Sequence, residues 1–151
     1  MMTEKRIDKM NEFLRNELSA VETYEMALKT TKHADFASAL QQLRNDHAQR
    51  VGMIRDKIRE WGGEPSETSG VWGAFTKVVQ AGADILGNTV AISALEEGED
   101  HGLKLYRDIL NDTDVDVIAV RNYVSAVLLP AQQKSHDACR SLKRFAKNVA
   151  A

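Results

Sequence analysis

Apolar residues recur at intervals of three and four positions along four segments of the sequence, and this spacing constrains the fold more than any other feature. On a helix such residues share one face, because each residue turns the chain by about 100°. No segment alternates apolar and polar residues over the length of a strand, so no strand is predicted. The four stripes are Ile7, Met10, Leu14, Leu18, Val21 and Leu28; Phe36, Leu40, Leu43, Val51, Ile54, Ile58 and Trp61; Ile92, Leu95, Leu103, Tyr106 and Leu110; and, less regularly, Ile118, Ser125, Leu129 and Cys139.

Polar breaks divide these stripes into helices expected at about residues 4–30, 35–61, 89–111 and 115–148. Asp35 and Asp114 are candidate N-caps of the second and fourth of these helices. Short breaks make the first two helices antiparallel neighbours, and likewise the last two.

About 25 residues separate the second and third helices, which is enough to cross the length of a bundle, and a further helix is expected there at 71–86. Two helical hairpins joined by one long crossover form the ferritin-like four-helix bundle. The sequence therefore predicts an all-α fold of this kind as one domain over residues 1–151, with an irregular helical bundle as the alternative.

The composition limits the classes of partner and compartment. The formal net charge is -2, so a nucleic-acid partner is not expected. No run of about 18 apolar residues occurs and the first residues are charged, so neither a membrane span nor a secretory signal is expected. A single cysteine, Cys139, forms no internal disulfide, which fits the cytoplasm.

Four ionisable residues fall on the predicted apolar faces, one in each long helix: Glu17, His47, Glu99 and His136. A buried carboxylate or imidazolium must be paired, hydrogen-bonded, neutralised or bound to a metal. Two acidic and two imidazole side chains satisfy this requirement either by ligating one or two cations or by contacting one another.

The two halves of the chain repeat a spacing. Glu17 precedes Tyr24 by seven residues, and Glu99 precedes Tyr106 by seven, so each tyrosine lies two turns along the face of its own glutamate. A phenol placed in this way is predicted to hydrogen-bond the carboxylate of the opposite half. A weak internal duplication is the simplest explanation.

Several short motifs resemble those of rubrerythrin-type ferritin-like proteins. The segment ELSAVETY at 17–24 resembles their first-helix motif, and Asp46-His47-Ala48 resembles the end of their second-helix Glu-x-x-His motif. Gly98-Glu99 resembles the third-helix motif, and His136 the fourth. Over roughly residues 10–145 the chain resembles a family of uncharacterised bacterial ferritin-like proteins. The resemblance implies a metal site made of Glu17, His47, Glu99 and His136.

The chain departs from that pattern at the positions of the bridging carboxylates. Arg44 stands three residues before His47, and Gln133 stands three residues before His136, where the family pattern has glutamate. Gly102 stands where rubrerythrins carry a further carboxylate three residues after the third-helix glutamate. A permanent positive charge at Arg44 would occupy the place of a cation.

Two functional hypotheses follow, and neither assigns a catalytic residue. In the first, a metal-free core polar network around Arg44 makes the protein a non-catalytic structural or interaction module, with a homodimer formed through the crossover at 71–86. In the second, the protein binds one iron, zinc or manganese ion and has a redox or stress-related role. The partners that would support the four ligands in this second hypothesis are Tyr24, Tyr106 and Gln133. A complete di-iron site would need further carboxylates, and is the less favoured form.

Overall fold

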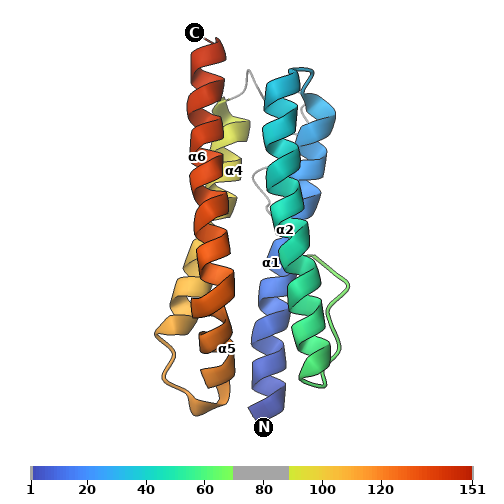
Figure 1. The fold of residues 1–151 in the computed structure, drawn as a ribbon, viewed down its shortest axis with the longest axis vertical. Coiled ribbons are helices and arrows are strands. Elements are labelled where there is room, and N and C mark those ends of the chain that lie inside the picture. The colour runs from blue at the N-terminus through green and yellow to red at the C-terminus, as the bar shows by residue number, and fades with distance from the viewer. Residues whose placement is uncertain (1, 70–88, 151) are drawn as a thin grey trace.

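The protein is a bundle of two antiparallel helical hairpins (Figure 1). The computed structural model describes residues 2–69 and 89–150. The first hairpin is α1 (Met2–Thr30) and α2 (Ala34–Glu60). In the second hairpin α4 (Thr89–Leu110) packs against a helical stretch that runs without a break to the end of the described chain. Its parts are the 3₁₀ turn η1 (Val115–Val117), α5 (Ile118–Tyr123), the π-helical turn η2 (Val124–Leu128) and α6 (Leu129–Ala150). An all-α class with four helices packed together is confirmed.

The chain leaves α2 along the outer side of α1. Asn11 Nδ2 donates a hydrogen bond to the Glu64 carbonyl (3.0 Å) and Asn11 Oδ1 accepts one from the Ser66 amide (2.7 Å). The Ser69 hydroxyl then donates to Glu22 (2.8 Å), further along the same helix. The crossover helix expected at 71–86 lies outside the described residues, so the dimer predicted through it stays a prediction. Among the described helices, none has a stretch apolar enough and long enough to cross a membrane.

Of the two N-caps predicted from the sequence, Asp114 is confirmed and Asp35 is wrong. Asp114 caps the 3₁₀ turn η1, where its side chain accepts a hydrogen bond from the Asp116 amide (2.9 Å). Asp35 does not cap α2, because the helix begins one residue earlier than expected. His33 takes the N-cap position instead, and its Nδ1 accepts from the Phe36 amide (3.3 Å).

The stripe predicted for the last helix is wrong by about one residue in its first half, whereas Cys139 is buried as predicted. Ile118 and Ser125 are exposed, whereas Val117, Val120 and Val124 are buried. The buried positions continue with Leu128 and Gln132, so three successive steps are four residues long. A π-helical turn holds more residues than an α-helical one, and η2 supplies that extra length just before Pro130. The missing N–H of Pro130 fits a locally opened helix at this point.

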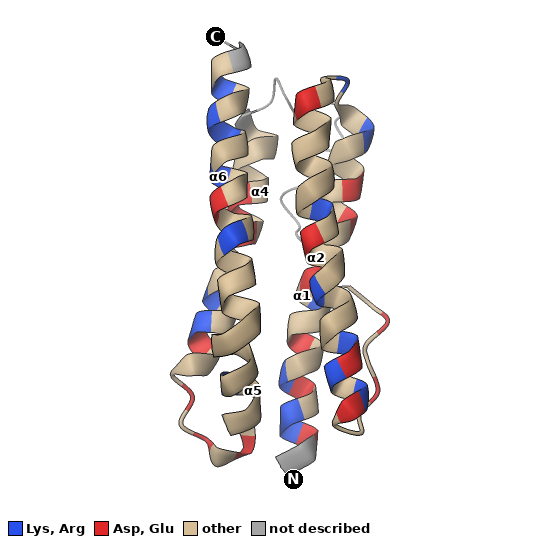
Figure 2. Cartoon of the chain, in the orientation of Figure 1, with Lys and Arg blue, Asp and Glu red and all other residues tan. Residues whose placement is uncertain are grey.

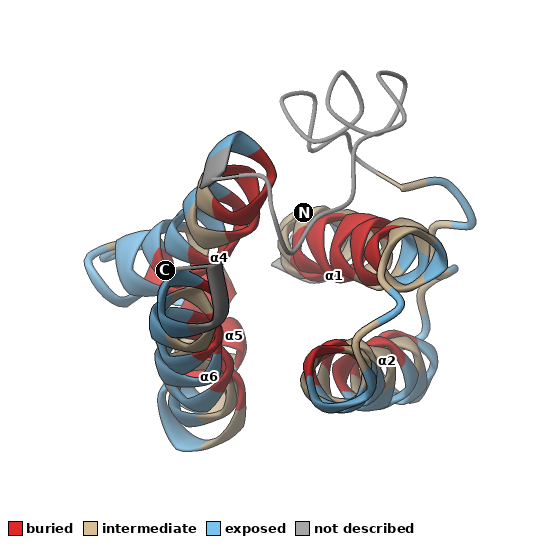
Figure 3. Ribbon diagram, turned by 90° about the horizontal axis from the view of Figure 1, so that it is seen from above, coloured by how far each residue is buried: buried red, intermediate tan, exposed pale blue. Residues whose placement is uncertain are grey.

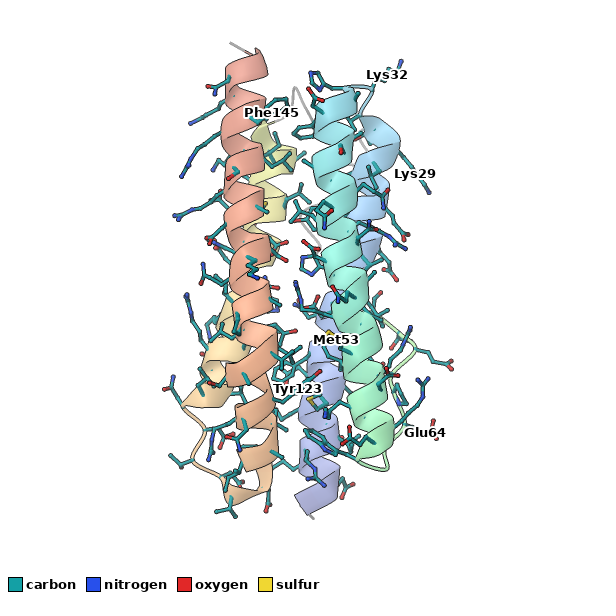
Figure 4. The ribbon with its side chains drawn as sticks, viewed as in Figure 1. Lys29, Lys32, Met53, Glu64, Tyr123 and Phe145 are labelled. Carbon is teal, nitrogen blue, oxygen red and sulfur yellow. The ribbon has the colours of Figure 1, made fainter. Side chains whose placement is uncertain are left out.

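The interior consists of two apolar clusters with a polar layer between them. The upper cluster lies near the C-terminal end of α6, where Phe145 packs against it, and the lower cluster is contacted by Tyr123 (Figure 4). Seen along the bundle, buried residues lie on the helix sides that face one another (Figure 3). The upper cluster includes Tyr24, Phe36, Leu40, Leu43, Leu95 and Leu142; the lower includes Met10, Phe13, Leu14, Ile54, Tyr106 and Val124. The middle of each long helix therefore contributes to the polar layer.

Two glycines of the first hairpin should respond oppositely to alanine. Gly52 lies inside α2 with no atom within 4 Å of an added Cβ, so Gly52→Ala should raise the free energy of unfolding by about 1 kcal/mol. Gly62 ends α2 with a φ of 82°, which disfavours a side chain, so Gly62→Ala should lower it by about 1 kcal/mol. Urea unfolding followed by circular dichroism measures both, and a neutral Gly62→Ala would contradict the assigned turn.

Candidate functional site: a buried ionic network

Six polar side chains fill the layer between the two apolar clusters. None of them is more than 2% exposed, so their partners must come from within the bundle. They come from all four long helices: Glu17 on α1, His47 and Arg50 on α2, Glu99 on α4, and Gln132 and Ser135 on α6. The structure therefore brings together three of the four predicted inward residues, Glu17, His47 and Glu99.

His47 bridges the two carboxylates. Its Nδ1 lies 2.6 Å from Glu17 Oε2, and its Nε2 lies 2.7 Å from Glu99 Oε1. A ring protonated on both nitrogens donates a hydrogen bond to each glutamate. The Tyr24 ring is stacked on the imidazole, with centroids 5.6 Å apart, and closes one side of it.

The two tyrosines cross between the halves of the chain. Tyr24 on α1 donates its hydroxyl hydrogen to Glu99 Oε1 on α4 (2.7 Å). Tyr106 on α4 donates to Glu17 Oε1 on α1, also at 2.7 Å. The predicted exchange of phenol and carboxylate between the two half-repeats is confirmed. Because the Glu-to-Tyr spacing is two turns, each tyrosine reaches from an apolar cluster into the polar layer.

Arg50 is the second cation of the layer, and it was not predicted from the sequence. Its Nε donates to Glu17 Oε1 (2.9 Å), its Nη1 to the Ser135 hydroxyl (3.0 Å) and its Nη2 to Gln132 Oε1 (2.8 Å). Nη2 also lies 2.8 Å from His47 Nδ1. When Nδ1 carries a proton it donates to Glu17, and when it does not it accepts from Arg50. The guanidinium thus links α2 to α1 and α6 in either state.

Gln132 completes the shell around Glu99. Its Nε2 donates to Glu99 Oε2 (2.8 Å) and to the Glu99 carbonyl (3.0 Å). Gly102 provides the room for this amide, because a Cβ at that position would lie 2.8 Å from Gln132 Nε2. A residue with a side chain at position 102, such as the carboxylate of the rubrerythrin pattern, would therefore collide with the Gln132 amide in this position.

The layer balances two negative charges with two positive ones. Burial alone would raise the pKa of Glu17, but the positive charges of Arg50 and His47 outweigh it and lower that pKa to about 2. Burial would likewise lower the pKa of His47, but the carboxylates of Glu99 and Glu17 raise it to about 9. At neutral pH the imidazolium and the guanidinium therefore neutralise the two glutamates.

The placement predicted for Arg44 and Gln133 is wrong. Arg44 lies on the outside of the bundle, where its Nε and Nη2 donate to Glu25 Oε1 on α1 (3.1 and 2.9 Å). Gln133 is also at the surface, between Arg107 and Asp137, with both hydrogen bonds 3.1 Å long. The cause in the last helix is the register, since η2 turns Gln132 rather than Gln133 toward the core.

His136 does not join the other three predicted ligands. Its Nε2 lies 2.5 Å from Oδ1 of Asp100, whose side chain is exposed at the edge of the α4–α6 hairpin. It follows Ser135 by one residue, which turns it about 100° away from the side of α6 that contacts Arg50. His136 therefore flanks the polar layer rather than closing it.

The two core carboxylates are already occupied by side chains of the protein. Glu17 and Glu99 each accept three contacts from side chains of this layer, and Arg50 places a fixed positive charge against Glu17. A cation would have to displace the guanidinium and remove the proton from His47. Within residues 2–69 and 89–150, no group of three or more His, Cys, Asp or Glu side chains is arranged to hold a metal.

One signal in the sequence could have indicated Arg50. Arg44 and Arg50 each lie three residues from His47, so both are about 60° from it around the helix, on opposite sides. Helical geometry alone therefore places Arg44 and Arg50 equally close to the inward face of α2. Which of the two enters the core depends on where α1 and α6 pack against α2. Two buried glutamates need two positive charges, however. His47 supplies one of them, and Arg50 is as good a candidate as Arg44 for the other.

Comparison with known families gives one match. The family model of a domain of unknown function (DUF2383) matches residues 5–112, which is well over half of the chain. The chain belongs to the DUF2383 family. No curated protein and no solved structure matches it. The predicted membership of a family without an assigned function is confirmed at this level. The DUF2383 match contains Glu17, His47, Arg50 and Glu99, and ends before the α6 residues of the network.

Removing the buried guanidinium should be far more costly than removing the exposed one. Arg50→Met leaves Glu17 buried with a missing partner, and should lower the free energy of unfolding by about 3–5 kcal/mol. Arg44→Met, the matched control, breaks only the exposed pair with Glu25 and should cost less than about 1 kcal/mol. Urea unfolding of both variants measures the difference; equal losses would contradict the placement of Arg50.

The stability should depend on pH through His47. Its pKa is about 9 when folded and 6.5 ordinarily, so the folded state holds a proton that the unfolded state releases. The free energy of unfolding should fall by up to about 3 kcal/mol as pH rises through this interval. Glu17 acts at the acid end, where its stabilisation is lost between about pH 4.5 and 2.

Urea unfolding across this range measures the effect, with His47→Gln as the control. This variant keeps a side chain of similar reach but does not titrate, so its alkaline slope should disappear. A profile of the unchanged protein that is flat between about pH 6.5 and 9 would show that His47 is not held as an imidazolium.

Proposed function

We propose that this protein is a ferritin-like bundle without metal chemistry, which acts as a non-catalytic structural or interaction module. The observation that carries the proposal is the position of Arg50, whose guanidinium contacts Glu17, His47, Gln132 and Ser135 at the centre of the polar layer. In this proposal, Arg50 and the His47 imidazolium supply the positive charge that metal ions supply in related bundles.

The spacing of the inward residues supports the relation to ferritin-like proteins. Those bundles take one glutamate from each of two helices and a Glu-x-x-His pair from each of the other two. Here α1 and α4 supply Glu17 and Glu99, while the paired positions at the same three-residue spacing are His47 and Arg50 on α2. The corresponding pair on α6 is Gln132 and Ser135. This register of inward positions differs from the sequence-based one, in which the pairs ended at His47 and His136, and in it none of the four positions carries the residue of the metal-binding pattern.

The chemistry of these replacements argues against a bound cation. Arginine has no lone pair to offer a metal and stays protonated, so Arg50 cannot act as a ligand. Gln132 and Ser135 are neutral, so the layer keeps only two carboxylates to balance metal charge. Those carboxylates are already neutralised by His47 and Arg50.

The proposed structural role rests on the way the polar network links the two helical hairpins. His47 and Arg50 on the first hairpin contact Glu99, Gln132 and Ser135 on the second. A fully satisfied polar layer of this kind tolerates one alignment of the helices, because a slip by one turn would leave charges buried and unpaired. The proposed function is therefore to hold a fixed helical surface for a partner, with the predicted homodimer as one such use.

The metal content tests this proposal. Protein purified without chelator or affinity tag and then loaded with ferrous iron or zinc should retain less than about a tenth of an equivalent of metal. The variant His47→Glu, Arg50→His, Gln132→Glu, Ser135→His restores the pattern at the inward positions and should retain up to about two equivalents. Elemental analysis after gel filtration gives the readout.

A single substitution provides the matched control. Arg44→Glu creates the Glu-x-x-His spacing in the sequence, but on the outer side of α2 where Arg44 contacts Glu25. It should therefore leave the metal content unchanged. The proposal fails if the unchanged protein retains about one equivalent of metal and Glu17→Gln abolishes that retention.

A further inference from the structure

A row of basic side chains runs along one side of α6 near its C-terminal end. Arg140, Lys143, Arg144 and Lys147 stand at positions i, i+3, i+4 and i+7, so they fall within about 100° of one another around the helix. Figure 2 shows blue segments recurring along the part of α6 next to the C-terminus. Residues 138–151 contain no acidic residue. These four side chains, the basic stripe, therefore make this side of α6 positively charged.

Most of this charge is unpaired. Lys143 contacts Glu96 on α4 (3.3 Å), but no carboxylate of the described residues forms an ion pair with Arg140, Arg144 or Lys147. The side chains of all three are exposed. The basic stripe therefore keeps three positive charges in solvent.

The other carboxylates at this edge of the α4–α6 hairpin have partners of their own. Asp100 Oδ1 lies 2.5 Å from His136 Nε2, and Asp137 Oδ1 accepts a hydrogen bond from Gln133 (3.1 Å). Neither carboxylate forms an ion pair with the basic stripe. Acidic groups that pair with its three exposed cations would therefore have to come from outside the described residues.

The fold itself does not account for this grouping of charge. The stripe contains two pairs of like charges four residues apart, and such pairs destabilise a helix. The helix dipole favours cations only within the last turn, where Lys147 lies. Helix formation therefore gives no reason for the positions of Arg140 and Arg144. Grouped charge that lowers stability is expected where it serves binding.

The helix under the stripe is fixed by its opposite side. Cys139, Leu142 and Ala146 are at most 3% exposed and belong to the upper apolar cluster. Along the helix axis, about 10 Å separates the first and last positions of the stripe. A second helix with carboxylates at the same spacing of i, i+3, i+4 and i+7 would place them opposite the whole stripe.

An acidic protein segment matches this surface better than a membrane or a nucleic acid does. Helices that lie on membranes need exposed apolar residues, and the exposed large apolar residues of the described chain all lie outside α6. A nucleic acid carries many phosphates, which the net charge of -2 on the whole chain repels. A short acidic helix has fewer charges and contacts the stripe alone.

We propose that the basic stripe binds an acidic helical segment of another protein through charge pairing with Arg140, Arg144 and Lys147. This inference rests on the proposed function, since it names the class of partner for the fixed helical surface. Metal retention tests the core, whereas peptide binding tests the outside of α6. Absence of peptide binding in a protein that retains no metal would refute the partner alone. Retained metal together with peptide binding at the stripe would refute the metal-free core alone.

An NMR titration of the unchanged protein with a synthetic helical peptide tests the surface. The peptide is alanine-based with glutamates at i, i+3, i+4 and i+7, and a control peptide of the same composition has them spread around the helix. At about 20 mM salt the first peptide should bind with a Kd below about 1 mM, at least about fivefold more tightly than the control. Amide signals should shift mainly over residues 138–148, and about 300 mM salt should weaken binding at least about fivefold. Equal binding of the two peptides, no saturation, or shifts centred elsewhere would overturn the proposal.

Two charge-matched variants locate the binding. The stripe variant carries Arg140→Gln, Arg144→Gln and Lys147→Gln, and its control carries Lys29→Gln, Lys32→Gln and Lys134→Gln. The control removes the same charge elsewhere, because Lys29 and Lys32 lie on the first hairpin (Figure 4) and Lys134 faces another side of α6. The stripe variant should bind the peptide about tenfold more weakly or worse, and the control within about twofold of the unchanged protein. Equal losses would indicate attraction by net charge alone and refute the stripe as the site.

Two further measurements separate other roles of the stripe. The stripe variant should unfold at the same urea concentration as the unchanged protein or a higher one, because like charges are removed. A lower midpoint would show that these cations serve the fold rather than a partner. Tighter binding of single-stranded DNA or phosphatidylserine vesicles than of the peptide, or a dimer in light scattering that the stripe variant loses, would assign the surface to a different occupant and overturn the proposal.

Discussion

The ion pair between Arg50 and Glu17 joins α2 to α1 at the centre of the bundle, and the rest of the polar layer is arranged around it. A carboxylate that is 0% exposed stays charged only if positive charge is held next to it. The His47 imidazolium places positive charge next to both glutamates, and the hydroxyls of Tyr24 and Tyr106 donate further hydrogen bonds to them. Each ion in the layer is therefore satisfied by partners on other helices.

This layer is also the main polar connection between the two hairpins. Packing is closer within each hairpin than between them, so the bundle relies on its centre to fix their relative position. Tyr24 to Glu99, Tyr106 to Glu17 and His47 to Glu99 all cross that boundary. Such bonds add little net stability, because desolvation offsets them, but they penalise every other alignment of the helices. This makes a structural role physically reasonable for a core that looks like a reaction centre.

Much of the fold and part of the site were predictable from the sequence, for identifiable reasons. The stripes of α1, α2 and α4 are regular, so Glu17, His47 and Glu99 were placed inward correctly. The seven-residue spacing of each Glu–Tyr pair was enough to predict the crossed hydrogen bonds. The prediction for the last helix was wrong because η2 shifts the phase of the helix. Gln133 and His136 were predicted to face the layer, but Gln132 and Ser135 do so in the structure. Periodicity assumes a constant turn, and a π-turn breaks that assumption.

Apolar spacing along the chain is enough to predict that two carboxylates and an imidazole enter the core of a helical bundle, because it fixes which residues share a face. Which cation contacts them depends on how the helices pack. Arg44 and Arg50 are equivalent by rotation about α2, and differ only in what lies beside them: Glu25 at the surface for one, Glu17 and α6 in the core for the other. The neighbours of a helix are set by how all four helices pack, which no local pattern encodes. That packing brings Arg50 and His47 against Glu17 and Glu99, so the charges of the layer balance within the protein.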